Sequence, residues 1–206
     1  DIAIFAAVSE TFSQRNTGCS IAESMDRLAR VAVRAHDAGL RVRGYLSCVM
    51  GCPYEGAVSA ETVATLAAEL IAMGCHEVSL GDTTGAGSPF RVRALIDSVA
   101  RHVPPRQIAG HFHDTRGMAA ANAYAAALAG VTVFDASVGG LGGCPFAPGA
   151  TGNVATEDLV YLFDDAGVHT GVDLQKLVDV ASWISAQLGH PVASRVARAF
   201  NSRRPT

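Results

Sequence analysis

The chain has 206 residues, of which 49% are hydrophobic and 17% charged, and its formal net charge is -3 at pH 7. This length and composition predict one large globular domain, and they give no reason to expect nucleic acid, an anionic membrane surface or a membrane-spanning helix of roughly 20 apolar residues. The five cysteines are an odd number at irregular positions, which argues against a disulfide framework and predicts a reducing compartment.

Short apolar runs alternate with amphipathic stretches along the chain, and the runs predict five strands. The first strand is expected over residues 2–8, and a capping box at Ser20 and Glu23 predicts the start of a helix that ends near Gly39. Further strands are expected over 41–50, 76–80, 107–113 and 131–137, with helices over 60–73, 89–102 and 117–129 between them. Three more helices are expected over 156–166, 174–188 and 191–199.

The alternation of apolar strands and helices predicts an α/β fold with a parallel sheet, either doubly wound or a TIM (β/α)8 barrel. No G-x-G-x-x-G or G-x-x-x-x-G-K-[ST] motif follows a strand, which weakens the nucleotide-binding alternative. Polar residues instead recur just past several strands, as expected for a barrel active site: Ser9, Glu10, Ser47, Asp82, His111, His113, Asp114 and Asp135. A barrel has about eight strands, so we expect residues 1–206 to belong to a single catalytic barrel domain whose N-terminal strands are missing from this sequence.

His111 and His113 lie two residues apart at the end of the fourth expected strand, and Asp114 follows them. On a strand, side chains two residues apart point to the same face, so both imidazoles can reach one metal ion. The same spacing opens the metal site of zinc hydrolase barrels, so it does not fix the chemistry. The other five histidines are interpreted as structural or surface groups.

The segment 138–153, VGGLGGCPFAPGATGN, directly follows the last expected strand, and its glycines and prolines predict an irregular loop over the barrel mouth. Cys144 is either a catalytic acid or base on this flexible loop or a small buried residue. Asn153 could cap the next helix or ligate a hard cation, and its residue type alone favours capping. Asp82, in SLGDTTGAGSP, is either an active-site group or an Asx-turn residue, and Glu55 is expected to be solvated.

Four segments carry a resemblance to a known family: RGYLSCVMGCPYEG, SLGDTTGAGSP, GHFHDTRGMAAANA and SVGGLGGCPFAPGATGNVATEDLVYLF. From residue 1 to about residue 190 the chain resembles the hydroxymethylglutaryl-CoA lyases, which are TIM-barrel metalloenzymes related to isopropylmalate and homocitrate synthases. The H-x-H pair is shared across that superfamily, whereas the loop that holds Cys144 is more specific to the lyases. By this resemblance, the expected strands correspond to barrel strands four to eight.

The resemblance implies a role for each candidate residue. His111 and His113 match the family's two histidine ligands, and Asn153 matches its amide ligand, which replaces the capping role. Cys144 matches a loop cysteine that acts as catalytic acid or base, His111 also takes part in proton transfer, and Asp82 matches an active-site aspartate. The family's Arg-Asp pair on the first barrel strand and its glutamate on the second have no counterpart in this sequence.

The implied reaction is the metal-dependent retro-Claisen cleavage of 3-hydroxy-3-methylglutaryl-CoA to acetyl-CoA and acetoacetate, as in leucine degradation and ketone-body formation. Imidazole and amide ligands without a thiolate favour Mg²⁺ or Mn²⁺ over Zn²⁺. The expected partner is an acyl-CoA substrate, with a homodimer as the expected assembly, in the bacterial cytoplasm or in the mitochondrial matrix or peroxisome. Two alternatives stay open: a related lyase or aldolase that acts on another 3-hydroxyacyl-CoA or a 2-oxo acid, and a non-catalytic fragment.

Overall fold

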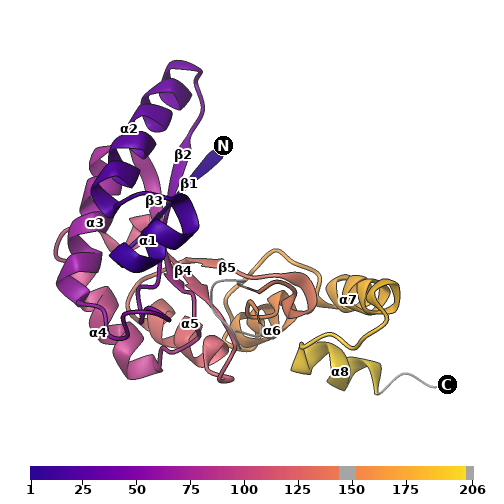
Figure 1. The fold of residues 1–206 in the computed structure, drawn as a ribbon. Coiled ribbons are helices and arrows are strands. Elements are labelled where there is room, and N and C mark those ends of the chain that lie inside the picture. Colours follow the sequence, from indigo (N-terminus) through magenta and orange to yellow (C-terminus); the bar gives the residue numbers. More distant parts are fainter. Residues whose placement is uncertain (144–151, 203–206) are drawn as a thin grey trace.

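The computed structural model describes residues 1–143 and 152–202, and its centre is a five-stranded parallel sheet (Figure 1). The strands are β1 (Ile2–Ala7), β2 (Val42–Ser47), β3 (Cys75–Asp82), β4 (Ile108–Phe112) and β5 (Val133–Asp135). They lie side by side in chain order, and each pairs in parallel with the next. A doubly wound sheet reverses its strand order at a switch point, so this uninterrupted order is that of consecutive TIM-barrel strands. The predicted fold class is confirmed.

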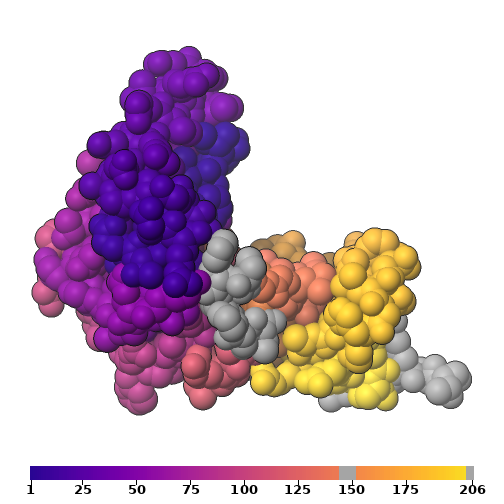
Figure 2. All heavy atoms as spheres, in the orientation of Figure 1, coloured from indigo at the N-terminus to yellow at the C-terminus, as the bar shows by residue number. Residues whose placement is uncertain are grey.

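Helices follow the first four strands in turn: α2 (Ile21–Asp37), α3 (Ala60–Ala72), α4 (Pro89–Val99) and α5 (Ala119–Leu128). Figure 1 shows them along one side of the sheet. Beyond β5, α6 (Thr156–Asp165), α7 (Leu174–Leu188) and α8 (Arg195–Asn201) pack against one another. In the space-filling view the indigo and magenta N-terminal half and the yellow C-terminal helices form two arms (Figure 2). None of the helices in the described part of the chain is both long enough and apolar enough to cross a membrane.

The two faces of the sheet differ because side chains alternate along each strand. The face toward the helices is apolar, and Ile4, Leu46, Val78 and Ile108 on it are at most 3% exposed. We call the opposite face the polar face. Its polar side chains are those of Arg43, Tyr45, Glu77, Ser79, His111 and Asp135. Parallel strands are usually apolar on both faces, so polar groups in these positions need partners within the protein.

The capping box predicted at Ser20 and Glu23 is confirmed at the start of α2. The Ser20 hydroxyl accepts a hydrogen bond from the Glu23 N–H at 3.2 Å, and the Glu23 carboxylate accepts one from the Ser20 N–H at 3.1 Å. Two of the four N–H groups that a helix start leaves without partners are satisfied in this way.

Three of the differences between the predicted and the observed elements have a local cause. A short helix, α1 (Glu10–Thr17), follows β1 and was not predicted, because only Phe12 in it is a buried apolar residue and no periodic stripe marks it. The second strand ends at Ser47 rather than residue 50, because Cys48 has a φ of 67° and turns the chain out of the extended conformation. The last helix begins at Arg195 rather than residue 191, after Ser194 as N-cap.

The Ser20→Ala substitution should lower the free energy of unfolding by about 1 kcal/mol, because it removes the side-chain acceptor for the Glu23 N–H. Ser88 is the matched control, since it is the N-cap of α4 but makes no side-chain cap hydrogen bond. Ser88→Ala should change stability by less than about 0.5 kcal/mol. Urea denaturation of both variants measures the difference, and equal losses would show that the capping box contributes nothing specific.

Candidate functional site

Two histidines stand where β4 reaches the carboxyl end of the sheet. The side chain of His111, on the strand, is 27% exposed, and His113, just past it, is 6% exposed. Their ring centroids are 5.4 Å apart, with an interplanar angle of 47°. The two rings are therefore neighbours, as the spacing predicts, and they are close enough to serve one ion.

His113 has a buried nitrogen without a partner, since its Nδ1 makes no hydrogen bond with any described residue. Burial, and then the charge of His111, lower the pKa of His113 to about 4, while a hydrogen bond with the backbone at Thr83 acts in the opposite direction. Because Nδ1 is unpartnered, we assign that bond to Nε2. The ring is then neutral near pH 7 and presents the lone pair of Nδ1, which is the form of histidine that binds a metal ion.

Backbone pairing brings Asn153 beside His113, although the two lie far apart in sequence. They form an antiparallel bridge that is flanked on both sides by backbone hydrogen bonds of 3.0 Å. The Asn153 Nδ2 group donates to the Leu141 carbonyl at 2.9 Å, which leaves Oδ1 as an acceptor. The capping interpretation of Asn153 is wrong, because the N-cap of α6 is Ala155 and makes no side-chain cap hydrogen bond.

The donors at this end of the sheet fit a divalent cation. They are the Nδ1 atom of His113, a ring nitrogen of His111 and the Oδ1 atom of Asn153, all neutral and none a thiolate. Within residues 1–143 and 152–202, no three His, Cys, Asp or Glu side chains are grouped as a metal site, so an ion here would need the amide as well as the imidazoles. The observation that favours an ion is the buried Nδ1, because buried polar atoms in proteins almost always have a partner.

A cluster of charged side chains joins three strands on the polar face. Arg43 on β2 forms ion pairs with Glu77 on β3 at 2.5 Å and with Asp135 on β5 at 2.6 Å, and it also contacts the Tyr45 hydroxyl. The three charged side chains are 11% to 20% exposed. Burial acts to lower the pKa of Arg43, but the hydrogen bond to Asp135 and the charges of the nearby carboxylates outweigh burial. The pKa of Arg43 is therefore raised, and the guanidinium stays charged.

Asp135 connects this cluster to the histidine pair. Its Oδ1 accepts from Arg43, and its Oδ2 accepts from the Ser79 hydroxyl at 2.6 Å and faces His111 Nδ1 at 3.3 Å. Burial acts to raise the pKa of Asp135, but hydrogen bonds from His111, Ser79 and Arg43 outweigh it and lower the pKa to about 2. The carboxylate is therefore ionised near neutral pH, where it can only accept hydrogen bonds.

Sequence reasoning placed Asp135 among the polar residues that follow strands, but it assigned no role to Arg43 or Glu77. A signal was present in Arg43-x-Tyr45 and Glu77-x-Ser79, where polar residues alternate within apolar runs. In a parallel sheet that alternation predicts buried polar groups that must find partners. The identity of those partners depends on which strands are neighbours, which the alternation does not reveal.

Asp82 is fully buried, and its two carboxylate oxygens accept hydrogen bonds from the N–H groups of Ala86 at 2.9 Å and Gly87 at 2.7 Å. Burial raises the pKa of Asp82, and the two backbone hydrogen bonds oppose that rise. A Cβ atom on Gly87 would lie 2.8 Å from Oδ2, so this close approach requires glycine. Asp82 thus anchors the loop 83–88, which favours the Asx-turn interpretation, and its catalytic role stays a prediction.

Cys144 lies outside the described residues, as does the rest of 144–151. The chain on both sides of this segment is well anchored. Glu157 is fully buried, and its two carboxylate oxygens accept from the Gly139 N–H at 2.9 and 3.0 Å. Burial raises the pKa of Glu157, and the hydrogen bond from Gly139 opposes that rise. Asn153 pairs with His113 and donates to the Leu141 carbonyl, so described residues from both sides of the segment are joined next to His113.

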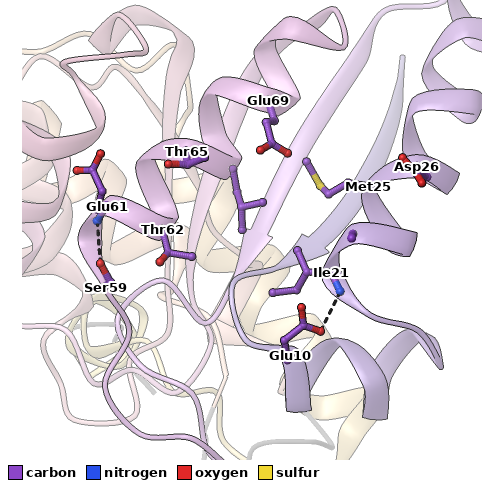
Figure 3. Close-up of a pocket in the computed structure, with 11 residues that line it drawn as sticks. Glu10, Ile21, Met25, Asp26, Ser59, Glu61, Thr62, Thr65 and Glu69 are labelled. Atoms are coloured by element: carbon purple, nitrogen blue, oxygen red, sulfur yellow. Dashed lines mark hydrogen bonds between the residues drawn. The ribbon is translucent and has the colours of Figure 1, made fainter.

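A groove of about 700 Å³ lies away from these residues, between α1, α2 and α3 (Figure 3). Glu10, Asp26, Glu61 and Glu69 line it together with apolar and threonine side chains. None of its lining residues belongs to the polar face or to the histidine pair.

The residues that the sequence analysis interpreted as structural, surface or solvated groups are exposed or half-buried and lie elsewhere: Glu55, His36, His76, His102, His169 and His190. The candidate site is therefore the carboxyl end of the sheet.

Consecutive barrel strands with two histidines, an amide and an ionised carboxylate at their carboxyl ends define this protein as an enzyme of the TIM-barrel class. The chain belongs to the HMGL-like family, whose model matches residues 1–184. It is 55% identical over 200 residues to the 3-hydroxy-3-isohexenylglutaryl-CoA/hydroxymethylglutaryl-CoA lyase of Pseudomonas aeruginosa. It is 54% identical over 203 residues to the hydroxymethylglutaryl-CoA lyase of Pseudomonas mevalonii.

These two alignments cover 97% and 98% of this chain and 67% of each relative. The crystal structure of hydroxymethylglutaryl-CoA lyase from Pseudomonas aeruginosa matches with a TM-score of 0.94 at 54% identity, over 98% of this chain and 67% of that one. The chain thus spans about two thirds of the length of these relatives. The resemblance to the family and the predicted fold are both confirmed.

The Asp82→Asn substitution should lower the free energy of unfolding by about 1–3 kcal/mol, because the amide NH₂ must face one of two buried N–H donors. Amide hydrogen exchange at Ala86 and Gly87 should accelerate more than exchange in the strands. Asp97→Asn is the control, since Asp97 makes only an exposed pair with Arg93 and should change stability by less than about 1 kcal/mol. Unchanged exchange in the loop would contradict the anchoring role.

Proposed function

We propose that this protein is a carbon–carbon lyase that cleaves 3-hydroxy-3-methylglutaryl-CoA to acetyl-CoA and acetoacetate. The observation that carries the proposal is the bridge of His113 to Asn153, which pairs a histidine whose buried Nδ1 has no partner among the described residues with an asparagine whose Nδ2 donates to Leu141. Its family membership and the names of its relatives support the same reaction. We propose further that residues 1–206 belong to one catalytic domain and that the protein acts as a homodimer.

His111, His113 and Asn153 would hold the divalent cation, and their neutral nitrogen and oxygen donors favour Mg²⁺ or Mn²⁺. When bound, the cation supplies Lewis-acid chemistry: it lowers the pKa of the substrate's tertiary hydroxyl and orients that group. His113 contributes a fixed, neutral ring, since burial keeps it unprotonated. Asn153 contributes an oxygen whose direction is set by its Nδ2 hydrogen bond to Leu141.

In the proposed reaction the tertiary hydroxyl loses its proton to a base, and His111 takes part in this proton transfer. The electron pair of that O–H bond forms the ketone of acetoacetate, the C2–C3 bond breaks, and its electron pair becomes the enolate of acetyl-CoA. Cys144 delivers a proton to C2 of the enolate, which completes acetyl-CoA. Asp135 is placed beside Nδ1 of His111 and can orient the ring for this role.

A second substrate follows from one relative's name. The lyase from Pseudomonas aeruginosa is named for 3-hydroxy-3-isohexenylglutaryl-CoA as well as for the methyl compound. Turnover of both thioesters by the purified protein, with acetyl-CoA measured after chelation and after return of Mg²⁺ or Mn²⁺, tests the function and its acyl-chain range. If neither thioester yields acetyl-CoA with either metal, the proposal is overturned.

His113→Ala should weaken Mn²⁺ binding to the metal-free protein by at least about tenfold, because a ligand contributes no less than the outer-shell groups whose loss costs 10–100-fold. Excess Mn²⁺ should restore part of its activity. His111→Ala should also weaken binding but stay inactive at saturating Mn²⁺, because it lacks the ring that takes part in proton transfer. His190→Ala, at an exposed position, is the control. Calorimetric titration with wild-type affinity in both site variants would contradict the metal site.

Cys144→Ser should lower kcat by about 10²–10⁴ with little change in Mn²⁺ affinity, because a hydroxyl exchanges protons poorly near neutral pH. Iodoacetamide should inactivate the wild-type protein, and a substrate analogue should protect it. Background labelling should be slow, since Cys19, Cys48, Cys52 and Cys75 are at most 5% exposed and burial raises the pKa of Cys75 to about 11. Near-normal turnover of the serine variant would remove Cys144 from the mechanism.

A further inference from the structure

We propose that Asp135 is a positioning residue for His111: its carboxylate keeps the ring proton on Nδ1, so that the Nε2 lone pair is presented to the cation. The inference rests on the proposed function, because it assigns Asp135 to the same site. It gives a specific role to a residue that the sequence analysis only grouped with the polar residues at strand ends.

Backbone register places the two groups side by side. His111 and Asp135 are direct partners in the parallel pairing of β4 with β5. Their side chains leave the same face of the sheet, and Asp135 Oδ2 lies 3.3 Å from His111 Nδ1. The His111 ring also makes a T-shaped contact with the Tyr45 ring, with the centroids 6.2 Å apart and an interplanar angle of 81°. The ring therefore contacts both a carboxylate and an aromatic ring.

The contact with Asp135 determines which ring nitrogen carries the proton. An ionised carboxylate only accepts hydrogen bonds, so the nitrogen that faces it must be protonated. In a neutral imidazole the other nitrogen, Nε2, then has a free lone pair. A carboxylate that fixes the tautomer of a histidine ligand in this way is common in metal sites, and its loss costs about 10–100-fold in affinity.

Asparagine cannot replace this carboxylate, because every oxygen of Asp135 is already committed. Oδ1 accepts from Arg43, and Oδ2 accepts from Ser79 as well as from His111. If the amide oxygen of an asparagine faced Arg43, its NH₂ group would face His111 and favour the tautomer with the proton on Nε2. If the oxygen faced His111, the NH₂ group would face the Arg43 guanidinium, and two hydrogen-bond donors would then lie against each other.

A comparison with Glu77 distinguishes a positioning role of Asp135 from simple balancing of the Arg43 charge. It pairs with the same guanidinium, and it is slightly less exposed than Asp135, at 11% against 20%. No contact links Glu77 to His111 among the described residues. If Asp135 served only to balance Arg43, loss of charge at Glu77 should disturb the site as much as loss of charge at Asp135.

The test is a double-mutant cycle on the whole, metal-free protein, with Mn²⁺ affinity as the readout. Asp135→Asn should weaken Mn²⁺ binding by about 10–100-fold in the wild-type background and by less than about twofold in the His111→Ala background. Glu77→Gln should leave the affinity within about twofold of wild type. Equal losses from Asp135→Asn in both backgrounds, or an equal loss from Glu77→Gln, would overturn the positioning role.

The cycle also separates this inference from the proposed metal site. If His111→Ala leaves Mn²⁺ affinity unchanged, the proposed site fails and the inference fails with it. If His111→Ala weakens binding but the effect of Asp135→Asn is additive, the site stands and the inference alone fails.

A second measurement does not depend on the folding of any Asp135 variant. Long-range proton–nitrogen correlation spectra of the wild-type protein, labelled with ¹⁵N-histidine, report the tautomer of each ring, and His111→Gln identifies the signals of His111. Metal-free wild-type protein should show His111 with its proton on Nδ1. Protonation on Nε2 in the neutral ring would overturn the proposal.

Discussion

The ion pair between Arg43 and Asp135 ties the second strand of the sheet to the fifth, with two strands between them. Neighbouring strands lie about 4.8 Å apart, so these two strands would be separated by about 14 Å in a flat sheet. A contact of 2.6 Å therefore requires both the length of the arginine side chain and a sheet that curves toward its polar face. Helices cover the other face, so the curvature is that of a barrel wall with its polar face inward.

The same ion pair bears on both the stability of the fold and the state of the candidate site. Moving charges out of water is costly, and a buried pair offsets that cost only when its remaining hydrogen-bonding positions are filled. Glu77 fills one side of Arg43, and Ser79 fills one side of Asp135. Asp135 also contacts His111, so the carboxylate that neutralises the guanidinium lies against a proposed metal ligand. A change in either charge would therefore affect both the fold and the site.

The chain reaches the site a second time after β5. Buried Glu157 holds the Gly139 N–H at the start of the glycine-rich segment, and Asn153 pairs with His113 at its end. Two rigid anchors thus flank the segment that contains Cys144, and both stand on elements of the sheet or on α6. The two histidines themselves stand on β4 and directly after it, at the carboxyl end of the sheet. Asp82 anchors the loop 83–88 in a similar way, because its carboxylate accepts hydrogen bonds from two N–H groups of that loop.

Local pattern alone determined the alternation of strands and helices, the capping box at Ser20 and the pairing of His111 with His113 on one side of a strand. These features depend on residues close together in sequence, where the periods of strand and helix apply directly. Only the tertiary structure decided that Asn153 faces His113 rather than caps α6, that Asp82 anchors a loop, and that Arg43 meets Asp135. Each of these contacts joins residues brought together by strand order or by a returning loop. A polar side chain on a buried strand must find a partner, but its own sequence neighbours do not determine which partner the folded chain supplies.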